Sequence, residues 1–479
     1  MMKFNKKRSS AVFATMAIFL VLVMTFQALA PVLNAAAAPQ ETGADFAETV
    51  TNTLYLPYVN NYAPLQTPFG VEMGSITPSG GLVEMVEAGV SWVRRNGLLW
   101  SQVEPTPGAR DWSAAAGLET ELKNASDNGL EAILIVRSTP PWAQKVAGSY
   151  CGPISADDFS AFGDFMYDVV SRYSKSPYNV KYYEIYNEPD IEVVPQESIY
   201  GCWGDASDPF FGGGYYGEML KVVYPRIKAA NPNAQVLTGG LLLDCDPINV
   251  CTGDKAVPPK FLRGMLAAGA GYSFDGVSFH AYDYGNSGLG VYSNDGWGNH
   301  GPVLVKKASY IRSILQDYGF GPNDKYLMNT EVALLKLSST CDTTCQLNKA
   351  YYGAEAYAAG IATGLQANVW YDVNGGWRNT NLLSPSLTPF PVYDTLRAAH
   401  NELRDAQFVR EVNLDANVRI YEFDRGDRLI WTVWSLDGSS HSLTLPGTPA
   451  AIKDVYGVSQ ARVNPITASV EPMYLEWYK

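Results

Sequence analysis

Two glutamates follow runs of strand-forming residues. Glu188 lies in Asn187-Glu188-Pro189, directly after the β-rich run Val180–Tyr186, and Glu331 follows the run Lys325–Thr330. These positions are far apart in the chain, so the two side chains can meet only if both strands belong to one sheet. In a parallel barrel the C-terminal ends of all strands lie on one face, where two facing carboxylates could cleave a glycosidic bond.

The two carboxyl groups would need opposite properties for this reaction. Glu188 is the candidate general acid and base, and burial together with the second carboxylate would raise its pKa. Glu331 is the candidate nucleophile, which must stay ionised. Asn187 is placed to hydrogen-bond a sugar hydroxyl beside the reacting carbon. The plainer alternatives are an exposed loop glutamate at 188 and a helix-start glutamate at 331.

The run Val277–Tyr282 offers two further polar side chains. Because strand residues alternate between two faces, its apolar residues should face surrounding helices and its other residues the barrel interior. Tyr282 could then donate to Glu331, and His280 could contact the substrate or the acid/base. A histidine with satisfied hydrogen bonds in the core is the alternative for His280.

Arg94 and several tryptophans complete the set of candidates. Arg94 is a charge inside a strand that should be buried, so it needs an anionic partner, either the nucleophile or Glu184 in the barrel floor. Trp370, which ends the last strand of the set below, is expected to form a platform on which a sugar stacks. Trp142 is a second candidate, and packing in the core or in loops is the alternative for it and for Trp203, Trp297 and Trp377.

Short β-type runs alternate with segments of helical periodicity from about residue 68 onward. The eight strand candidates are Phe69–Met73, Ser91–Asn96, Glu131–Arg137, Val180–Tyr186, Gln235–Gly239, Gly276–Ala281, Tyr326–Thr330 and Asn368–Val373. Eight such units predict an α/β fold, a (β/α)₈ TIM barrel over residues 67–404. The alternative, an open doubly wound sheet, would carry a Gly-x-Gly-x-x-Gly turn after its first strand, and none follows here.

Residues 405–479 follow a different pattern. Short alternating runs are separated by turn formers, at Val418–Phe423, Leu429–Trp434, Ser442–Leu445, Ala451–Val455 and Met473–Trp477. This pattern predicts a small C-terminal all-β, sandwich-like domain.

The N-terminus is typical of an export signal. Basic residues precede an apolar run from Ala11 to Ala30, and Ala35–Ala38 supplies small residues for cleavage. We expect a signal peptide over residues 1–38 and a linker over 39–66, with an uncleaved membrane anchor as the alternative. The protein is therefore expected to be secreted or extracellular, with no membrane contact beyond this segment.

Export makes disulfides the expected state of the six cysteines. Cys341 with Cys345 and Cys245 with Cys251 are close in sequence, which leaves Cys151 with Cys202. Fifteen pairings are formally open. Zinc at Cys341 and Cys345 is the alternative, but no second Cys or His pair stands near them.

The net charge of −13 argues against nucleic acid or an anionic membrane as a partner. It also weakly disfavours a polyanionic substrate, although a local basic cleft could override the average charge.

The motifs taken together resemble retaining glycoside hydrolases of clan A. They are Trp92-Val-Arg94, Trp100-Ser-Gln-Val-Glu-Pro105, Thr139-Pro-Pro-Trp142, Tyr186-Asn-Glu-Pro189, Phe279-His-Ala-Tyr282, Asn329-Thr-Glu331 and Trp370. From about residue 68 onward the chain is most similar to family 39-like members, which carry a small β-domain after the barrel, and next to family 5. The resemblance implies that Glu188 is the acid/base, Glu331 the nucleophile, Asn187 the 2-hydroxyl contact and Tyr282 the partner of the nucleophile.

Two positions depart from the family patterns. Tyr186 stands where tryptophan is common, and Thr139-Pro-Pro replaces the histidine that family 5 carries after its third strand. These departures weaken a cellulase assignment more than they weaken hydrolase chemistry.

The sequence therefore predicts a secreted retaining glycoside hydrolase that cleaves O-glycosidic bonds of a poly- or oligosaccharide by double displacement. We expect neither a cofactor nor a metal. The alternatives are a non-catalytic carbohydrate-binding protein on the same barrel and a transglycosylase. The sugar, the linkage, endo or exo action and the oligomeric state stay open.

Overall fold

Parallel strands close into a barrel in the computed structural model, which describes residues 67–194, 201–285, 288–299, 301–336 and 340–479. Neighbouring strands pair in the order β5-β4-β3-β2-β1-β10-β9-β6, and a β5–β6 pairing closes the ring. The eight strands are β1 (Phe69–Glu72), β2 (Trp92–Leu99), β3 (Glu131–Arg137), β4 (Tyr182–Ile185), β5 (Gln235–Leu237), β6 (Gly276–Tyr284), β9 (Tyr326–Leu335) and β10 (Ala367–Trp370). The predicted TIM barrel is confirmed.

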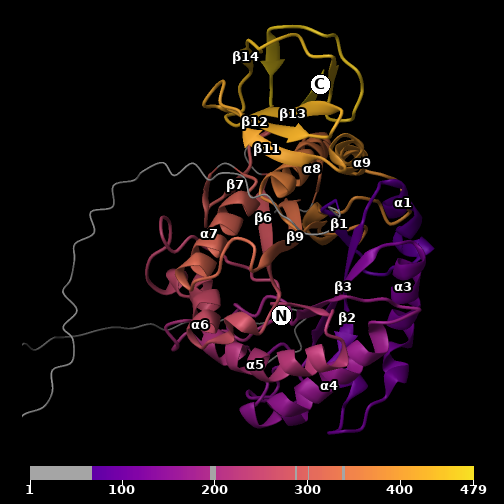
Figure 1. The fold of residues 1–479 in the computed structure, drawn as a ribbon, viewed down its shortest axis with the longest axis vertical. Helices are drawn as coiled ribbons and strands as arrows, with labels where there is room; N and C mark the ends of the chain where they lie inside the picture. The colour runs from indigo at the N-terminus through magenta and orange to yellow at the C-terminus, as the bar shows by residue number, and fades with distance from the viewer. Residues whose placement is uncertain (1–66, 195–200, 286–287, 300, 337–339) are drawn as a thin grey trace, which may run out of the picture. The chain divides into compact units, whose positions relative to one another are not determined.

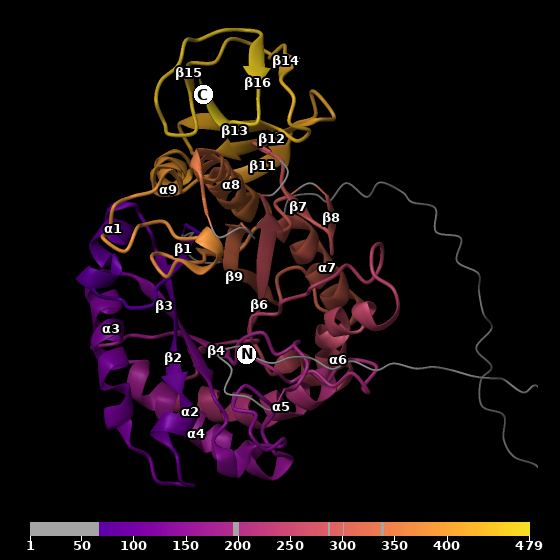
Figure 2. The ribbon, with the colours of Figure 1, turned by 180° about the vertical axis from the view of Figure 1, so that it is seen from behind.

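Helices between consecutive strands surround the barrel (Figures 1 and 2). They are α1 (Leu82–Glu87), α2 (Trp100–Val103), α3 (Ala116–Asp127), α4 (Phe159–Tyr173), α5 (Gly213–Ala230), α6 (Phe261–Ala267), α7 (Leu304–Asp317), α8 (Thr343–Ala362) and α9 (Pro391–Leu403). Short 3₁₀ turns lie at Pro78–Gly80, Trp112–Ala115, Pro141–Ala143, Ala156–Asp158, Gly253–Ala256, Pro258–Lys260, Ala270–Tyr272 and Trp377–Asn379. Two short strands, β7 (Ser293–Asn294) and β8 (Gly298–Asn299), pair in the segment after β6.

The barrel interior has an apolar floor and a charged upper layer. Residues from five strands form an apolar cluster of their own, namely Trp92, Ile133, Leu237, Met328, Ala367 and Val369. Side chains of one strand face the same way at every second residue. Arg94 on β2 and Arg137 on β3 therefore point into the barrel, nearer the C-terminal ends of their strands. This alternation brings charged groups to the end of the barrel where Glu188 and Glu331 lie.

Side chains along β6 alternate between the two faces of the barrel as predicted. Strand β9, in contrast, ends at a different residue than predicted. Val277, Phe279 and Ala281 pack in the core that faces the helices. Strand β9, however, does not stop at Glu331, because the four residues that follow it pair with β6 up to Tyr284. Glu331 is thus a residue within a strand, and the alternative of a helix-start glutamate is wrong.

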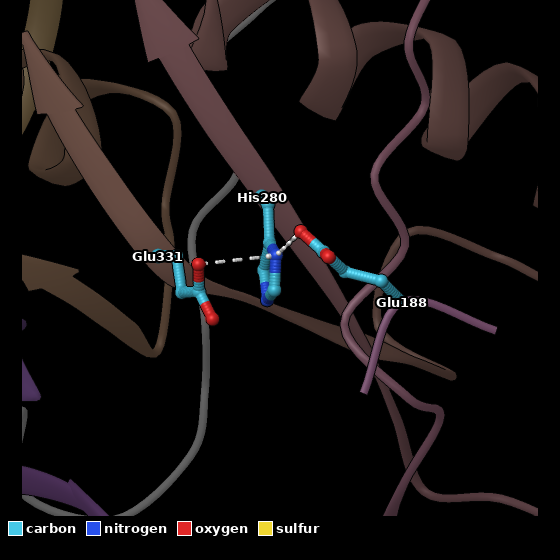
Figure 3. Close-up of side chains that lie close together, drawn as sticks. All are labelled: Glu188, His280 and Glu331. Carbon is cyan, nitrogen blue, oxygen red and sulfur yellow. Dashed lines mark hydrogen bonds and ion pairs between the residues drawn. The ribbon is translucent and has the colours of Figure 1, made fainter. Parts of the chain in front are cut away.

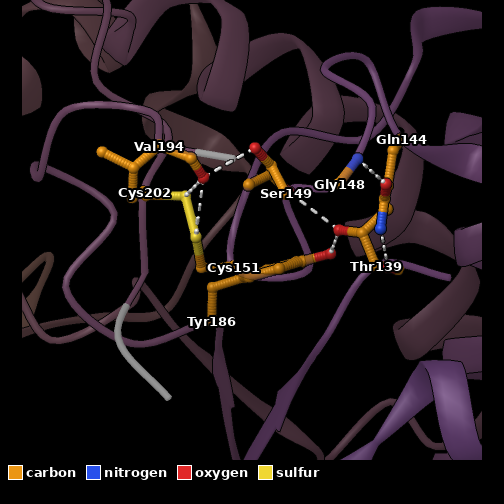
Figure 4. The surroundings of a disulfide bond; sticks show 9 residues. Thr139, Gln144, Gly148, Ser149, Cys151, Tyr186, Val194 and Cys202 are labelled. Carbon is orange, nitrogen blue, oxygen red and sulfur yellow. Dashed lines mark hydrogen bonds between the residues drawn. A yellow bond between two sulfur atoms is a disulfide. The ribbon is translucent and has the colours of Figure 1, made fainter. Parts of the chain in front are cut away.

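Three disulfides join the six cysteines, in the predicted pairs Cys151–Cys202, Cys245–Cys251 and Cys341–Cys345. The first spans 51 positions and links the loop after β3 to the loop after β4 (Figure 4). Beside it, the Ser149 hydroxyl donates to the Val194 carbonyl at 2.7 Å. The two loops that flank Asn187-Glu188 are therefore covalently tied.

Removing Cys151–Cys202 should destabilise the fold more than removing a short disulfide. Replacing both cysteines by serine should cost about 4 kcal/mol of unfolding free energy, because the longer loop restricts the unfolded chain more. The matched control, Cys341→Ser with Cys345→Ser, opens a loop of only four positions, and its expected cost is about 2 kcal/mol. Urea unfolding of the two double variants without reductant measures the difference, and equal losses would contradict the prediction.

The chain changes from barrel to antiparallel sheet between Leu403 and Gln407. Five strands pair in the order β11-β12-β13-β17-β15. They are β11 (Gln407–Glu411), β12 (Val418–Asp424), β13 (Arg428–Ser435), β17 (Met473–Tyr478) and β15 (Ala451–Lys453), and β14 (His441–Leu443) pairs with β16 (Ile466–Ala468). One apolar cluster joins the two sheets, for instance Ile420 and Val433 with Leu443 and Ile466. The predicted C-terminal all-β domain is confirmed, although the sequence analysis missed β11 and β16.

The expected signal peptide and linker, residues 1–66, lie outside the described residues. Across the described ranges, we find no helix with both the length and the apolar character needed to span a membrane.

Candidate active site

Glu188, His280 and Glu331 lie together at one end of the barrel. One carboxylate oxygen from each glutamate and one ring nitrogen of His280 all lie within 4.8 Å of one another. His280 Nδ1 is 2.8 Å from Glu188 Oε1 and 3.4 Å from Glu331 Oε2. In Figure 3 both carboxylates point toward the imidazole ring, from opposite sides. The structure therefore brings together three residues that the sequence analysis selected from three separate strands.

The backbone that carries Glu188 is strained. Tyr186 and Glu188 have positive φ angles of 63° and 43°, which residues with a side chain rarely adopt. The surroundings hold this turn in place, since Glu188 N donates to the Gly240 carbonyl at 3.1 Å. Such strain is typical of functional sites, where it fixes the direction of a reactive side chain.

The two departures from the family patterns contact each other. The hydroxyls of Tyr186 and Thr139 are 2.5 Å apart, next to the Cys151–Cys202 disulfide (Figure 4). The Tyr186 ring also packs edge-on against Trp203, with centroids 5.0 Å apart. Trp203 is buried, so its role here is to pack against Tyr186.

Glu331 receives two strong donors. Arg94 Nη1 donates to Glu331 Oε1 at 2.5 Å, and the Tyr282 hydroxyl donates to Glu331 Oε2. A guanidinium and a hydroxyl that both donate to a carboxylate favour its charged form.

Arg94 is fully buried, and its guanidinium connects the side chains of several residues around it. Its Nη1 also donates to Glu72 of β1, and its Nη2 donates to Glu184 at 2.6 Å and to Asn187 Oδ1 at 2.6 Å. Both partners considered in the sequence analysis, the candidate nucleophile and Glu184, are thus present. Glu72 was missed, although a carboxylate inside a buried strand is the same signal that selected Arg94.

His280 is neutral, and its tautomer follows from its neighbours. Burial lowers the pKa of His280 to about 4. Its Nε2 is 3.4 Å from Arg94 Nη2, and a guanidinium only donates, so Nε2 accepts and the proton is on Nδ1. His280 Nδ1–H therefore donates to Glu188 Oε1.

Lys307 of α7 fixes the backbone around His280 and was missed by the sequence analysis. Its buried ammonium group donates to the carbonyls of His280 at 2.8 Å and of Leu242 at 2.7 Å. Burial lowers the pKa of Lys307 to about 8. A lysine on a surrounding helix carries no motif that would reveal such a contact.

Burial raises the pKa of both glutamates. The pKa of Glu188 rises to about 7, against the opposing effect of the Arg94 charge. Burial raises the pKa of Glu331 to about 7 as well, and the charge of Arg94 opposes it. Glu331 has a cation and a hydroxyl as direct donors, whereas Glu188 has the neutral His280. Of the two carboxyls, Glu331 therefore ionises first and Glu188 keeps its proton.

The two predicted tryptophans both pack against other aromatic side chains. Trp370 has no exposed surface, its Nε1 donates to the Thr380 carbonyl at 2.8 Å, and its ring packs near Tyr352 of α8. No sugar can stack on it in this arrangement. Trp142 is half-buried, and its ring packs edge-on against Trp100, with centroids 5.2 Å apart.

Other aromatic rings stand beside the candidate nucleophile. Tyr371 and Trp377 have ring centroids 6.4 Å and 5.5 Å from that of Tyr282. Both are partly exposed. Trp377 was among the tryptophans weighed from the sequence, whereas Tyr371 was missed because Trp370, its neighbour, was taken as the residue facing the site.

The fold is similar to that of several solved glycoside hydrolases. A family 39 glycoside hydrolase from the gut symbiont Bacteroides cellulosilyticus is 18% identical, with 87% of this chain and 81% of that chain covered and a TM-score of 0.66. A family 30 endoxylanase from Clostridium papyrosolvens is 14% identical, with coverages of 88% and 99% and a TM-score of 0.56. A family 86 enzyme in complex with neoagarooctaose is 12% identical, with coverages of 88% and 76% and a TM-score of 0.58.

No family model and no curated protein matches the sequence. The likeness to solved structures is therefore one of fold, and it agrees with the barrel that the resemblance to family 39-like members predicts.

Proposed function

We propose that the protein is a retaining glycoside hydrolase, with Glu188 as acid/base and Glu331 as nucleophile. The observation that supports this most directly is the approach of a Glu188 oxygen to within 4.8 Å of a Glu331 oxygen. Retaining enzymes hold their carboxyl groups about 5–5.5 Å apart, whereas inverting enzymes need about 6.5–9.5 Å to admit a water.

In the first half-reaction Glu331 attacks the anomeric carbon and forms an ester. The bond from that carbon to the departing oxygen breaks, and the proton of Glu188 passes to this oxygen. Arg94 and Tyr282 hold the attacking carboxylate in place. Asn187 offers its Nδ2 group to the 2-hydroxyl, because its Oδ1 is occupied by Arg94.

In the second half-reaction Glu188 works as a base. Once Glu331 is esterified its charge is gone, so the pKa of Glu188 no longer has a neighbouring carboxylate to raise it. Glu188 then takes a proton from water, the hydroxide attacks the anomeric carbon, and Glu331 leaves as a carboxylate. The product keeps the anomeric configuration of the substrate.

The substrate class follows from the same proposal. A poly- or oligosaccharide substrate agrees with the family 86 neighbour, which was solved in complex with neoagarooctaose. The three disulfides suit the extracellular location that the N-terminal segment predicts.

A screen on polysaccharides and aryl glycosides of both anomeric series tests the proposal. Proton NMR of the first product formed should show the anomer of the substrate. The opposite anomer would overturn the retaining mechanism. Binding without turnover across the panel would favour the carbohydrate-binding protein, and transfer to an added sugar in place of water would favour the transglycosylase.

Gly240 provides a test of the position of His280. A methyl group at residue 240 would lie 2.1 Å from His280 Nε2, so Gly240→Ala must push the imidazole away. We expect kcat/KM to fall about 100-fold while the circular dichroism spectrum is unchanged, because small misplacements of catalytic groups have such costs. Gly117→Ala in α3, where the added methyl group meets open space, is the control. Full activity of Gly240→Ala would show that the ring position does not matter.

A further inference from the structure

Arg137 is a charged residue that the proposed mechanism does not use. It is the last residue of β3, on the same face as Ile133, which belongs to the apolar floor of the barrel. The Tyr186 amide donates to the Val136 carbonyl at 2.9 Å, so Arg137 stands beside the turn that carries Asn187. Its side chain therefore points into the barrel at the end where the glutamates lie.

The Arg137 guanidinium is buried without an anionic partner. The whole residue is only 9% exposed, and its Nε donates to the amide oxygen of Asn96 at 2.5 Å. Within the described ranges, no carboxylate forms an ion pair with Arg137. Glu72, the strongest favourable charge near it, is bound to Arg94.

Its surroundings make this cation costly. Burial lowers the pKa of Arg137 to about 10, and the charges of Arg94 and Arg95 act in the same direction. The group still carries its proton at neutral pH. A buried charge with no counter-ion costs free energy unless a ligand supplies one.

We propose that Arg137 recognises an anionic substituent, a carboxylate or a sulfate ester, on the sugar bound beside Asn187. This inference rests on the proposed glycosidase function and names its substrate class. The planar guanidinium suits both groups because each presents two oxygens to its parallel N–H bonds. The overall charge of −13 does not oppose it, since a cation fixed at the site acts at short range.

Two other roles are open to a buried arginine, and the experiment must separate them. Arg137 could offset the acidic groups around Arg94, or it could simply hold Asn96. Holding Asn96 would affect the binding of charged and neutral sugars alike. Offsetting the acidic groups needs only a positive charge, so Arg137→Lys would then keep the whole preference for acidic sugars. If Arg137 recognises an anion directly, its replacement should weaken the binding of acidic sugars and leave the binding of neutral sugars unchanged.

The test measures binding, so that it does not depend on turnover. Isothermal titration of the Glu331→Gln variant uses matched pairs of 4-nitrophenyl glycosides in both anomeric series, a glucuronide with a glucoside and a sulfated galactoside with the unsulfated one. We expect at least one acidic member to bind at least tenfold more tightly than its neutral partner, and the preference to shrink as salt is added. The glucuronide and sulfate pairs tell a carboxylate ligand from a sulfate ligand.

Adding Arg137→Gln should reduce this preference at least tenfold, and Arg137→Lys should retain part of it. Arg226→Gln is the matched control, since Arg226 is an exposed arginine paired with Asp164, and it should leave the preference as it was. Equal binding of acidic and neutral members, or a loss that is equal for both in Arg137→Gln, overturns the inference. If Arg137→Gln does not fold, the comparison of Arg137→Lys with the Glu331→Gln parent decides the matter, and an unchanged preference in Arg137→Lys overturns the inference.

The two proposals can fail separately. If the protein hydrolyses neutral glycosides and shows no acidic preference, the inference on Arg137 fails and the glycosidase stands. If an acidic preference is measured but Glu188 and Glu331 prove dispensable for any turnover, the glycosidase mechanism fails and the anion site stands.

Discussion

Replacing Glu331 by alanine should lower kcat by at least about 10⁴-fold, because no other group can form the ester. The loss should be as large on aryl glycosides with good leaving groups as on natural saccharides. Azide added to Glu331→Ala should enter from the vacated face and yield a glycosyl azide of inverted anomeric configuration. The rate of nitrophenol release and the NMR spectrum of the azide measure these outcomes.

The control for Glu331→Ala is Tyr282→Phe, which removes one donor to the same carboxylate. It should lose about 10- to 100-fold, since the nucleophile itself remains. Activity of Glu331→Ala within tenfold of the parent would show that the nucleophile is elsewhere.

Replacing Glu188 by alanine should change how activity depends on pH. In the proposed mechanism the parent reacts with Glu188 protonated, and burial raises the pKa of Glu188 to about 7. The kcat/KM of the parent should therefore fall as pH rises through about 7. In Glu188→Ala this fall should disappear on aryl glycosides whose leaving group needs no proton, while turnover of natural saccharides should drop about 10²- to 10⁴-fold.

Asp190 is the control for this assignment. Burial raises the pKa of Asp190 to about 7 as well, although its carboxylate accepts from the amides of Leu242 and Leu243. Asp190→Asn should keep the alkaline fall. If Glu188→Ala keeps the fall and Asp190→Asn loses it, the proton that matters belongs to Asp190.

Azide added to Glu188→Ala should give a glycosyl azide of retained anomeric configuration.

The strands of the barrel were predictable because each is a short buried run bounded by polar residues. The end of β9 was not predictable, since a charged residue such as Glu331 is typical of a strand boundary, whereas here it lies within the strand. The sequence also could not show which residues at the end of β10 point toward the site. All four residues of β10 are buried, so no alternation of polar and apolar residues shows that Trp370 faces α8 and Tyr371 the site.

The candidate site was predictable where charge or polarity broke an apolar pattern. Arg94, His280 and Tyr282 were all found by that signal. Glu72 and Arg137 carry it too, but the sequence could not say which charges pair with which. Lys307 reaches the site from a helix, and only the packing of α7 against β6 places it there.

The Cys151–Cys202 disulfide determines what a single proteolytic cut would do to this region. Strand β4 and Asn187-Glu188 lie between these cysteines in the chain. A single proteolytic cut anywhere between residues 151 and 202 would leave the two fragments joined through sulfur. The nicked protein would migrate as one band without reductant and as two with it, and the fragment that carries Glu188 would stay attached to the other.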